Sequence, residues 1–207
     1  MSFEVAIVGG GLVGAALARA LRGSSVALVS QERRSPGPIP TAFDSRIYAI
    51  SPGNAAFLSG MMAWQQMPPD RLTPVHAMRI FGDDGNSVIE FDAYRGGASE
   101  LAWIVEDALL QDALWRGLEA QERLTIVAPA ECERLELTSG RALLALRDRE
   151  MIEARLVVGA DGARSFVRAE ARIAAREHDY AQTAVVANFA CERPHRNVAF
   201  QWFQGGP

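Results

Sequence analysis

Residues 3–14 read FEVAIVGGGLVG, a short apolar run followed at once by a cluster of glycines. The apolar run at residues 3–8 predicts a strand buried inside a parallel sheet. Small and apolar residues continue from 12 to 21 and predict a helix packed closely on that sheet, and a second buried strand follows at 26–29. Strand, helix and strand in this order predict one right-handed βαβ unit.

Gly9, Gly11 and Gly14 follow the spacing G-x-G-x-x-G where the predicted strand meets the helix, with Val13 inside the motif. In this context the spacing is the fingerprint of a dinucleotide-binding turn. The first glycine allows a tight turn, the second lets the backbone approach a pyrophosphate, and the third lets helix and strand pack closely. The phosphates are expected on the free N–H groups at the positive end of the helix. The alternative is a glycine-rich turn without a ligand.

The fingerprint also includes an acidic residue about twenty positions further on, which binds the ribose hydroxyls. The second strand ends at Val29, and Ser30 stands where the acid is expected. Glu32 follows two residues later. We therefore expect either a weaker contact from Ser30 or a carboxylate from Glu32 that reaches back.

Further elements follow from local patterns. Ser51 followed by Pro52 predicts the N-cap and the first residue of a helix at 52–59. Apolar residues at helical spacing predict another helix at 106–120. Residues 31–41 contain three prolines and predict a loop. The expected helices are 52–59, 106–120 and 165–169. The expected strands are a hairpin at 78–81 and 88–91 around Asp83, Asp84 and Gly85, and then 124–127, 130–137, 141–146, 151–158, 184–190 and 198–203.

The composition indicates a globular protein, with 49% hydrophobic and 22% charged residues among 207. Acidic residues outnumber basic ones, 25 to 21, and no basic patch is visible, so we expect no nucleic-acid partner. Cys132 and Cys191 are far apart and the three histidines are scattered, so we expect neither a disulfide framework nor a metal site. No apolar run reaches the ~18 residues that a membrane span needs. A cytoplasmic protein is expected.

Four segments resemble one family. Residues 44–53 read DSRIYAISPG and are similar to the D-x-R-x-x-A-I-S segment of the FAD-dependent hydroxylases of ubiquinone biosynthesis, which are single-component aromatic-ring flavoprotein monooxygenases. Residues 103–106 (WIVE) with 110–115 (LQDALW), 158–168 (VGADGARSFVR) and 201–207 (QWFQGGP) resemble later family segments, in the same order. The resemblance implies an α/β fold, with a Rossmann-like FAD-binding domain and an interleaved, mixed β-sheet substrate domain.

The resemblance also implies how the chain is divided. The FAD-binding domain is expected at 1–74 and 100–174, and the substrate domain at 75–99, as a hairpin, and 175–207. The family carries a further cofactor motif, of the type G-D-A-A-H, that these residues do not include. The chain is therefore expected to be an N-terminal part whose substrate-domain sheet is incomplete and which is inactive alone.

Site residues follow from the resemblance. Arg46 matches an arginine that contacts the cofactor, Glu106 a polar contact on the flavin side, and Val127 a backbone position at the adenine. Asp161 matches an aspartate near the ribose and pyrophosphate. The plainer alternatives are an exposed loop arginine, a glutamate at a helix N-terminus, an ordinary strand residue and an Asx turn. No catalytic residue is identified. The expected cofactor-binding residues are Gly9, Gly11, Val13, Gly14, Ser30, Glu32, Arg46, Glu106, Val127 and Asp161.

The implied activity is the hydroxylation of a polyprenylated phenol with O₂, with FAD as cofactor and NAD(P)H as reductant. Peripheral association with the inner membrane or with a ubiquinone-biosynthesis complex is compatible with such a substrate, and so is a homo-oligomer. One alternative is a non-catalytic short homologue with a binding or scaffolding role, suggested by Ser30 and the missing motif. Another is an unrelated nicotinamide dehydrogenase, which the four flavoprotein segments disfavour.

Overall fold

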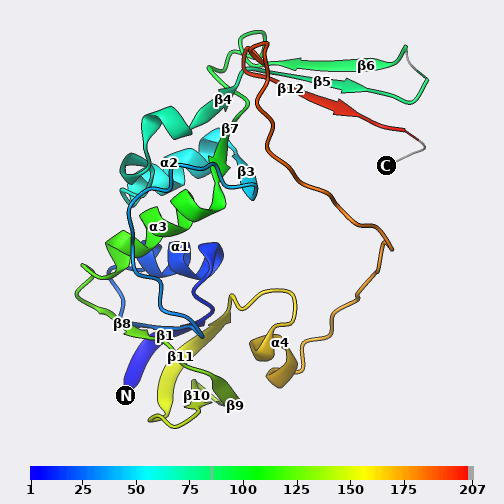
Figure 1. Ribbon diagram of the computed structural model, residues 1–207. Helices are drawn as coiled ribbons and strands as arrows, with labels where there is room; N and C mark the ends of the chain where they lie inside the picture. Colours follow the sequence, from blue (N-terminus) through cyan, green and yellow to red (C-terminus); the bar gives the residue numbers. More distant parts are fainter. Residues whose placement is uncertain (85, 205–207) are drawn as a thin grey trace. The chain divides into compact units, whose positions relative to one another are not determined.

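The computed structural model describes residues 1–84 and 86–204, and the chain divides into two compact units (Figure 1). The first unit comprises Met1–Pro38 and Gln111–Ala184, and the second comprises Ile39–Leu110 and the residues from Val185 onwards. Each unit is therefore built from two separate stretches of sequence. The boundaries between the two units fall after residues 38, 110 and 184. The domain boundaries expected after residues 74 and 99 lie inside the second unit, and the boundary expected after residue 174 lies inside the first.

A six-stranded sheet organises the first unit, in the order β8-β2-β1-β11-β10-β9. The strands β8, β2, β1 and β11 run parallel, and β10 pairs antiparallel with both β11 and β9. The sheet grows from β1 toward β2 and β8 on one side and toward β11 on the other, so β1 and β11 flank a topological switch point. The strands are β1 (Ser2–Val8), β2 (Val26–Val29), β8 (Leu124–Val127), β9 (Cys132–Thr138), β10 (Arg141–Leu146) and β11 (Ile152–Gly159).

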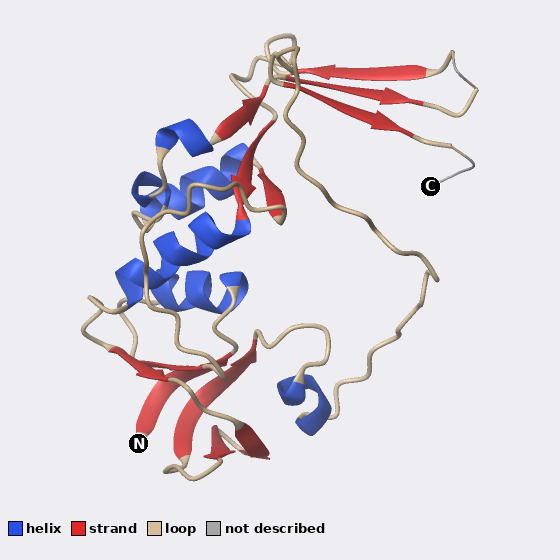
Figure 2. Ribbon diagram, viewed as in Figure 1, coloured by secondary structure: helices blue, strands red, loops and turns tan. Residues whose placement is uncertain are grey.

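Both faces of the parallel strands are covered. Helix α1 (Leu12–Ala20) packs on β1 and β2, and the part of α3 (Asp107–Leu118) in this unit packs beside α1 (Figure 2). On the other face, alternate residues such as Ala6 and Val8 form a core with β9, β10, β11 and the short helix α4 (Phe166–Glu170). Burial on both faces explains why β1 and β2 read as continuous apolar runs rather than as alternating patterns.

The second unit contains two three-stranded sheets, in the orders β3-β7-β4 and β12-β5-β6. Strand β12 pairs with β5 in parallel, although the β5–β6 pair is an antiparallel hairpin. Helix α2 (Pro52–Gly60) begins as predicted, because Ser51 Oγ accepts a hydrogen bond from the Asn54 N–H at 3.3 Å. The other elements are β3 (Ile47–Ile50), η1 (Trp64–Gln66), η2 (Pro69–Arg71), β4 (Thr73–Val75), β5 (Ala77–Phe81), β6 (Val88–Asp92), β7 (Ala102–Glu106) and β12 (Val198–Trp202).

One predicted strand is wrong. Residues 184–190 form no strand, and Val185 and Phe189 are 91% and 83% exposed. An apolar run becomes a strand only where another strand offers backbone partners, and no described strand pairs with this segment. Strands β3, β4 and β7 were not predicted, since they are short and β4 contains Pro74. The predicted turn residue Gly85, and Gly205, Gly206 and Pro207 of the last family segment, lie outside the described residues.

Candidate nucleotide-binding site

A cavity of about 570 Å³ lies in the first unit beyond the carboxyl ends of the parallel strands. Its walls include residues 9–11 after β1, 30–32 after β2, 130–132 after β8 and 160–162 after β11. Ligands of open α/β sheets bind in this crevice, at the switch point of the strand order. The fold therefore brings the glycine turn to the place where such sheets bind nucleotides.

Gly9 and Gly14 fix the shape of the turn. Gly9 has φ +111°, and a Cβ there would overlap the Ala160 carbonyl oxygen. A Cβ on Gly14 would overlap the Gly9 carbonyl oxygen. Both positions therefore exclude any side chain, which matches the roles that the motif assigns to its first and third glycines.

Gly11 differs, because a Cβ there would meet no heavy atom within 4 Å. Gly11 is the N-cap residue of α1, and no side chain caps this helix. The first N–H groups of α1 have no partner within the helix, and they carry its partial positive charge. Gly11 lines the cavity, whereas Val13, on the first turn of α1, is 72% exposed and is not among the lining residues.

Ser30 is held by the backbone around it. Its N–H donates to the Val127 carbonyl at 3.1 Å, and its own carbonyl accepts from the Ala130 N–H at 2.8 Å. The Glu32 N–H donates to Ser30 Oγ at 3.4 Å. Ser30 and Glu32 both line the cavity, whereas Val127 is buried in β8 and is not among the lining residues.

Asp161 lines the same cavity, and both of its carboxylate oxygens have partners. Oδ1 accepts from the Ser165 hydroxyl at 2.5 Å, and Oδ2 accepts from the Val167 N–H at 3.2 Å. Ser165 in turn caps α4, accepting from the Arg168 N–H at 3.0 Å. Asp161 therefore joins the end of β11 to the start of α4, through a hydroxyl and an N–H four and six residues further on rather than through an Asx turn.

The cavity wall carries charges of both signs. Arg34 and Arg164 line it, together with three acids: Glu32, Glu131 and Asp161. Burial, followed by the charges of Asp161 and Glu131, raises the pKa of the Cys132 thiol to about 11. An anion in this cavity would therefore depend on backbone N–H groups and the two arginines rather than on a strongly positive surface.

The sequence did not indicate the role of Trp115. Its indole Nε1 donates to the Gly10 carbonyl at 2.9 Å, and the ring is fully buried in α3. In the sequence, Trp115 is only the last residue of a segment that resembles the family. Its partner lies 105 residues earlier, so only the folded chain brings the two together.

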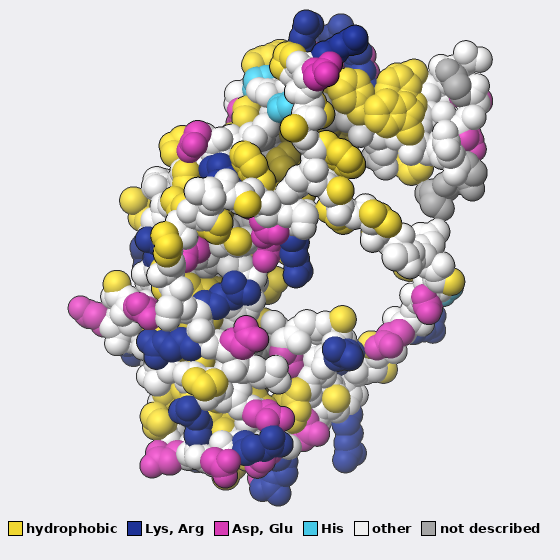
Figure 3. Space-filling model, in the orientation of Figure 1, with side chains coloured by type: hydrophobic (Ala, Val, Ile, Leu, Met, Phe, Trp, Pro, Cys, Tyr) yellow, Lys and Arg dark blue, Asp and Glu magenta, His cyan; other side chains and the backbone are white. Residues whose placement is uncertain are grey.

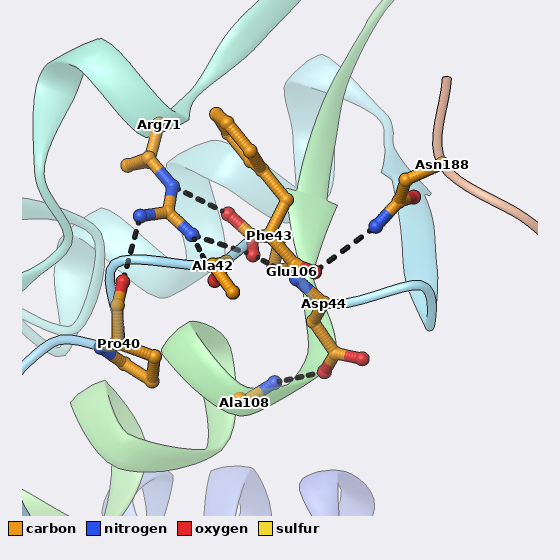
Figure 4. Close-up of polar contacts among 8 residues, drawn as sticks. All are labelled: Pro40, Ala42, Phe43, Asp44, Arg71, Glu106, Ala108 and Asn188. Atoms are coloured by element: carbon orange, nitrogen blue, oxygen red, sulfur yellow. Dashed lines mark hydrogen bonds and ion pairs between the residues drawn. The ribbon is translucent and has the colours of Figure 1, made fainter. Parts of the chain in front are cut away.

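Glu106 and Arg46 lie in the second unit, and Figure 4 shows the polar contacts around Glu106. The Glu106 carboxylate is bound at both oxygens by Arg71, since Nε donates to Oε1 and Nη2 to Oε2, each at 2.8 Å. The two side chains are only 7% and 10% exposed. The hydrogen bond to Glu106 raises the pKa of the Arg71 guanidinium. Glu106 is therefore half of a buried ion pair, and Arg71 is the partner that sequence reasoning missed.

The same ion pair holds the segment before Arg46. Arg71 donates to the carbonyls of Pro40 at 3.0 Å and Ala42 at 3.2 Å, and its guanidinium lies 4.2 Å from the centre of the Phe43 ring. The Asp44 N–H donates to Glu106 Oε2 at 2.6 Å. Residues 40–44 are thereby fixed by contacts at almost every position.

Asp44 continues the chain of contacts to Arg46. Its Oδ1 accepts from the Arg46 N–H at 2.9 Å, and its Oδ2 accepts from the Ala108 N–H at 3.2 Å, in the first turn of α3. The Arg46 side chain is exposed, and its Nε donates to Tyr48 Oη at 3.0 Å. This hydrogen bond raises the pKa of Arg46. The guanidinium keeps donors beyond the one used by Tyr48.

The glycine turn fits the diphosphate of a dinucleotide. Gly9 and Gly14 shape it, Gly11 leaves open space before the N-terminus of a nine-residue helix, and the cavity extends to Ser30 and Glu32. Among the described residues there is no group of three or more His, Cys, Asp or Glu side chains placed to hold a metal ion. In the same part of the chain, no helix is long and apolar enough to cross a membrane.

Comparison with known proteins gives relatives and a fold. No family model matches the sequence. The chain is 35% identical over 202 residues to 3-demethoxyubiquinol 3-hydroxylase of Escherichia coli, covering 97% of the chain and 51% of that protein. It is 34% identical over 201 residues to the ubiquinone hydroxylase UbiL of Rhodospirillum rubrum, covering 97% and 46%. The chain thus spans about half the length of the curated relatives it matches.

Two solved structures share the fold. PqsL of Pseudomonas aeruginosa matches with a TM-score of 0.70 and 21% identity, over 87% of this chain and 48% of that one. The p-nitrophenol 4-monooxygenase PnpA of Pseudomonas putida matches with a TM-score of 0.65 and 19% identity, over 82% and 44%. The fold is therefore that of the FAD-dependent monooxygenases, with the Rossmann-like domain that the sequence predicted.

Within that class the sequence similarity is more specific. The chain belongs to the family of ubiquinone-biosynthesis hydroxylases. This confirms the resemblance of the four segments, and it removes the unrelated dehydrogenase as an interpretation of the glycine turn.

Proposed function

We propose that the first unit binds the adenosine diphosphate end of FAD, and that the chain serves a flavin-dependent hydroxylation of a polyprenylated phenol in ubiquinone biosynthesis. One observation carries the proposal: at Gly11 the N-terminus of α1 opens without a capping side chain into the cavity at the sheet's switch point. This is where a diphosphate finds backbone N–H groups and a helix dipole together. The names of the relatives supply the substrate class.

Individual residues would divide the binding. The N–H groups of Gly11 and of the first turn of α1 would hold the diphosphate, with Arg34 and Arg164 as charged partners from the cavity wall. Glu32 would accept hydrogen bonds from the ribose hydroxyls, because it lines the cavity next to Ser30 and a carboxylate is an acceptor only. Asp161 would act mainly by fixing the end of β11, since both of its oxygens are engaged.

Bound FAD would supply the redox chemistry, taking electrons from NAD(P)H and activating O₂ toward the phenol. The chain's own residues would bind and orient. In the second unit, Arg46 remains a proposed cofactor-binding residue on the resemblance, because its guanidinium keeps donors beyond the one used by Tyr48. The Glu106–Arg71 pair would keep residues 40–46 in place rather than contact the flavin, because no oxygen of Glu106 is free of a donor.

The second unit also carries an apolar surface suited to a prenylated ring. On the sheet β12-β5-β6, Trp202 stacks on Phe81 at 5.2 Å and on Phe200 at 5.7 Å. Val88 of β6, which pairs with Phe81 and so lies on the same face, is also exposed, and Figure 3 shows hydrophobic side chains gathered over this sheet. Such a surface would bind an aromatic, lipid-like substrate. It also suits peripheral association with a membrane.

Titration of the purified 207-residue chain with FAD and ADP tests the cofactor proposal. We expect saturable quenching of tryptophan fluorescence by FAD, and competition by ADP. An assay with FAD, NADH or NADPH, a prenylated phenol and ¹⁸O₂ tests the chemistry, because a labelled hydroxyl in the product requires oxygen transfer. Absence of binding by either nucleotide would overturn the proposal. It would favour the non-catalytic alternative, to which the serine at position 30 points.

A further inference from the structure

We propose that Trp115 is a positioning residue for the diphosphate-binding turn. The inference deepens the proposed function and rests on it. The side chain is not itself among the residues that line the cavity: it lies in α3, fully buried, behind the turn. What it controls is the direction of one peptide group, that between Gly10 and Gly11.

The indole N–H holds the Gly10 carbonyl oxygen at 2.9 Å. The Gly10–Gly11 peptide is trans, and in a planar trans peptide the C=O and the following N–H point in opposite directions. Since the carbonyl points at Trp115, the Gly11 N–H points away from α3. Gly11 lines the cavity and has open space before it. The bond to Trp115 therefore aims the Gly11 N–H at the place proposed for the diphosphate.

Packing restricts the turn further. A Cβ on Gly10 would lie 2.8 Å from Cζ2 of Trp115, so the backbone of Gly10 rests directly on the indole ring. The Gly9 N–H donates to the Val29 carbonyl at 2.8 Å, which anchors the other end of the turn. Without the indole N–H, the buried Gly10 carbonyl would lose its partner. Rotation of the peptide to regain one would turn the Gly11 N–H away from the anion.

Binding of ADP and of adenosine to the wild-type chain and to Trp115→Phe tests the proposal. Phenylalanine keeps an aromatic ring but removes the N–H. Loss of one aimed donor should weaken ADP roughly three- to tenfold, whereas adenosine, which has no phosphate, should change by less than about twofold. Trp103→Phe is the matched control, because Trp103 lies in β7 and is not among the residues that line the cavity.

Because Trp115 is fully buried, the smaller ring could lower stability by itself. Replacement of Trp115 by benzothienylalanine exchanges the N–H for sulfur at nearly constant shape, and it should reproduce the selective loss of ADP. Equal weakening of ADP and adenosine, or unchanged ADP binding, would overturn the positioning role while leaving the proposed function intact. Failure of the wild-type chain to bind ADP at all would overturn both.

Discussion

The glycine turn of the first unit and the Glu106 cluster of the second unit both fix a loop beside a candidate cofactor contact, but by opposite means. The turn is shaped by missing side chains, since Gly9 and Gly14 let backbone lie against backbone. The cluster is shaped by full-sized charged side chains, with Arg71 bound to Glu106 and to the carbonyls of two loop residues. The first arrangement is steric and depends on the absence of side chains, whereas the second is electrostatic and depends on their charge.

The difference predicts how each region responds to mutation. At Gly9 and Gly14 a side chain would overlap the carbonyl oxygens of Ala160 and Gly9. These carbonyl groups directly follow β11 and β1, so they cannot move aside without shifting the ends of those strands. A buried ion pair fails when one partner is removed but recovers in part when both are removed. The following experiments test this contrast, beginning with the largest expected effect.

Gly9→Ala should destabilise the chain most. The new methyl group would overlap the Ala160 carbonyl, and alanine disfavours φ +111°. Strain and overpacking together should lower the free energy of unfolding by about 3 kcal/mol or more, as measured by urea denaturation. Gly23→Ala is the control, because a Cβ there meets nothing within 4 Å. Equal stability of the two variants would contradict the steric account of the turn.

Arg71→Met should cost about 3 kcal/mol of unfolding free energy, because it leaves the Glu106 carboxylate buried without its guanidinium. The exposed pair Arg79–Glu90 provides a control, since its side chains are 48% and 37% accessible. Arg79→Met should cost less than about 1 kcal/mol.

The double variant Arg71→Met with Glu106→Gln separates the two mechanisms. It should be more stable than the sum of the single changes predicts, because the uncompensated charge is gone. Strict additivity in chemical denaturation would show that the pair acts through packing alone.

Gly11→Ala should separate folding from binding. A methyl group at position 11 meets no protein atom, so the free energy of unfolding should change by less than about 1 kcal/mol. The same methyl group would stand in the space proposed for the diphosphate, and ADP affinity should fall about tenfold, which is about 1.4 kcal/mol. Calorimetric titration beside a melting curve gives both quantities. A variant that binds ADP normally would place the diphosphate elsewhere.

Cys132 gives a prediction that appears only at alkaline pH. Its pKa is raised from 9.0 to about 11 in the folded chain, so the unfolded chain loses the thiol proton first. The contribution of this group to stability is complete below pH 9 and is lost as the pH rises toward 11. The sequence contains no lysine, which keeps this range free of ammonium titrations. Cys132→Ser should flatten the decline relative to wild type, and a parallel decline in both would refute the shift.

Local patterns explain which parts of the molecule could be predicted. The strands at 26–29 and 124–127 are found at the predicted bounds, because each is a short apolar run closed by polar or turn residues. The conformations of Gly9 and Gly14 follow from spacing alone. The segment 184–190 shows the limit, because its apolar residues resemble a strand but find no pairing partner among the described strands.

Contacts between distant residues explain what could not be predicted. Trp115 meets Gly10 across 105 positions, and Arg71 meets Glu106 across 35. Neither pair has a spacing rule, since the partners come together only when α3, η2 and the end of β7 are in place. A buried tryptophan or an arginine before a short strand can have many roles. The sequence therefore does not reveal that Trp115 contacts Gly10 or that Arg71 contacts Glu106.

Strands β12 and β5 pair in parallel although they are far apart in the sequence, so β5 is translated long before its partner. The β5–β6 hairpin is translated early, and the ribosome must then produce the remainder of the first unit before Val198 emerges. Throughout that interval the nascent hairpin presents an unfilled edge with apolar residues, the kind of surface that chaperones shield. Among the described strands, β12 therefore joins a hairpin that was translated well before it, and the edge of β5 is covered only when β12 arrives.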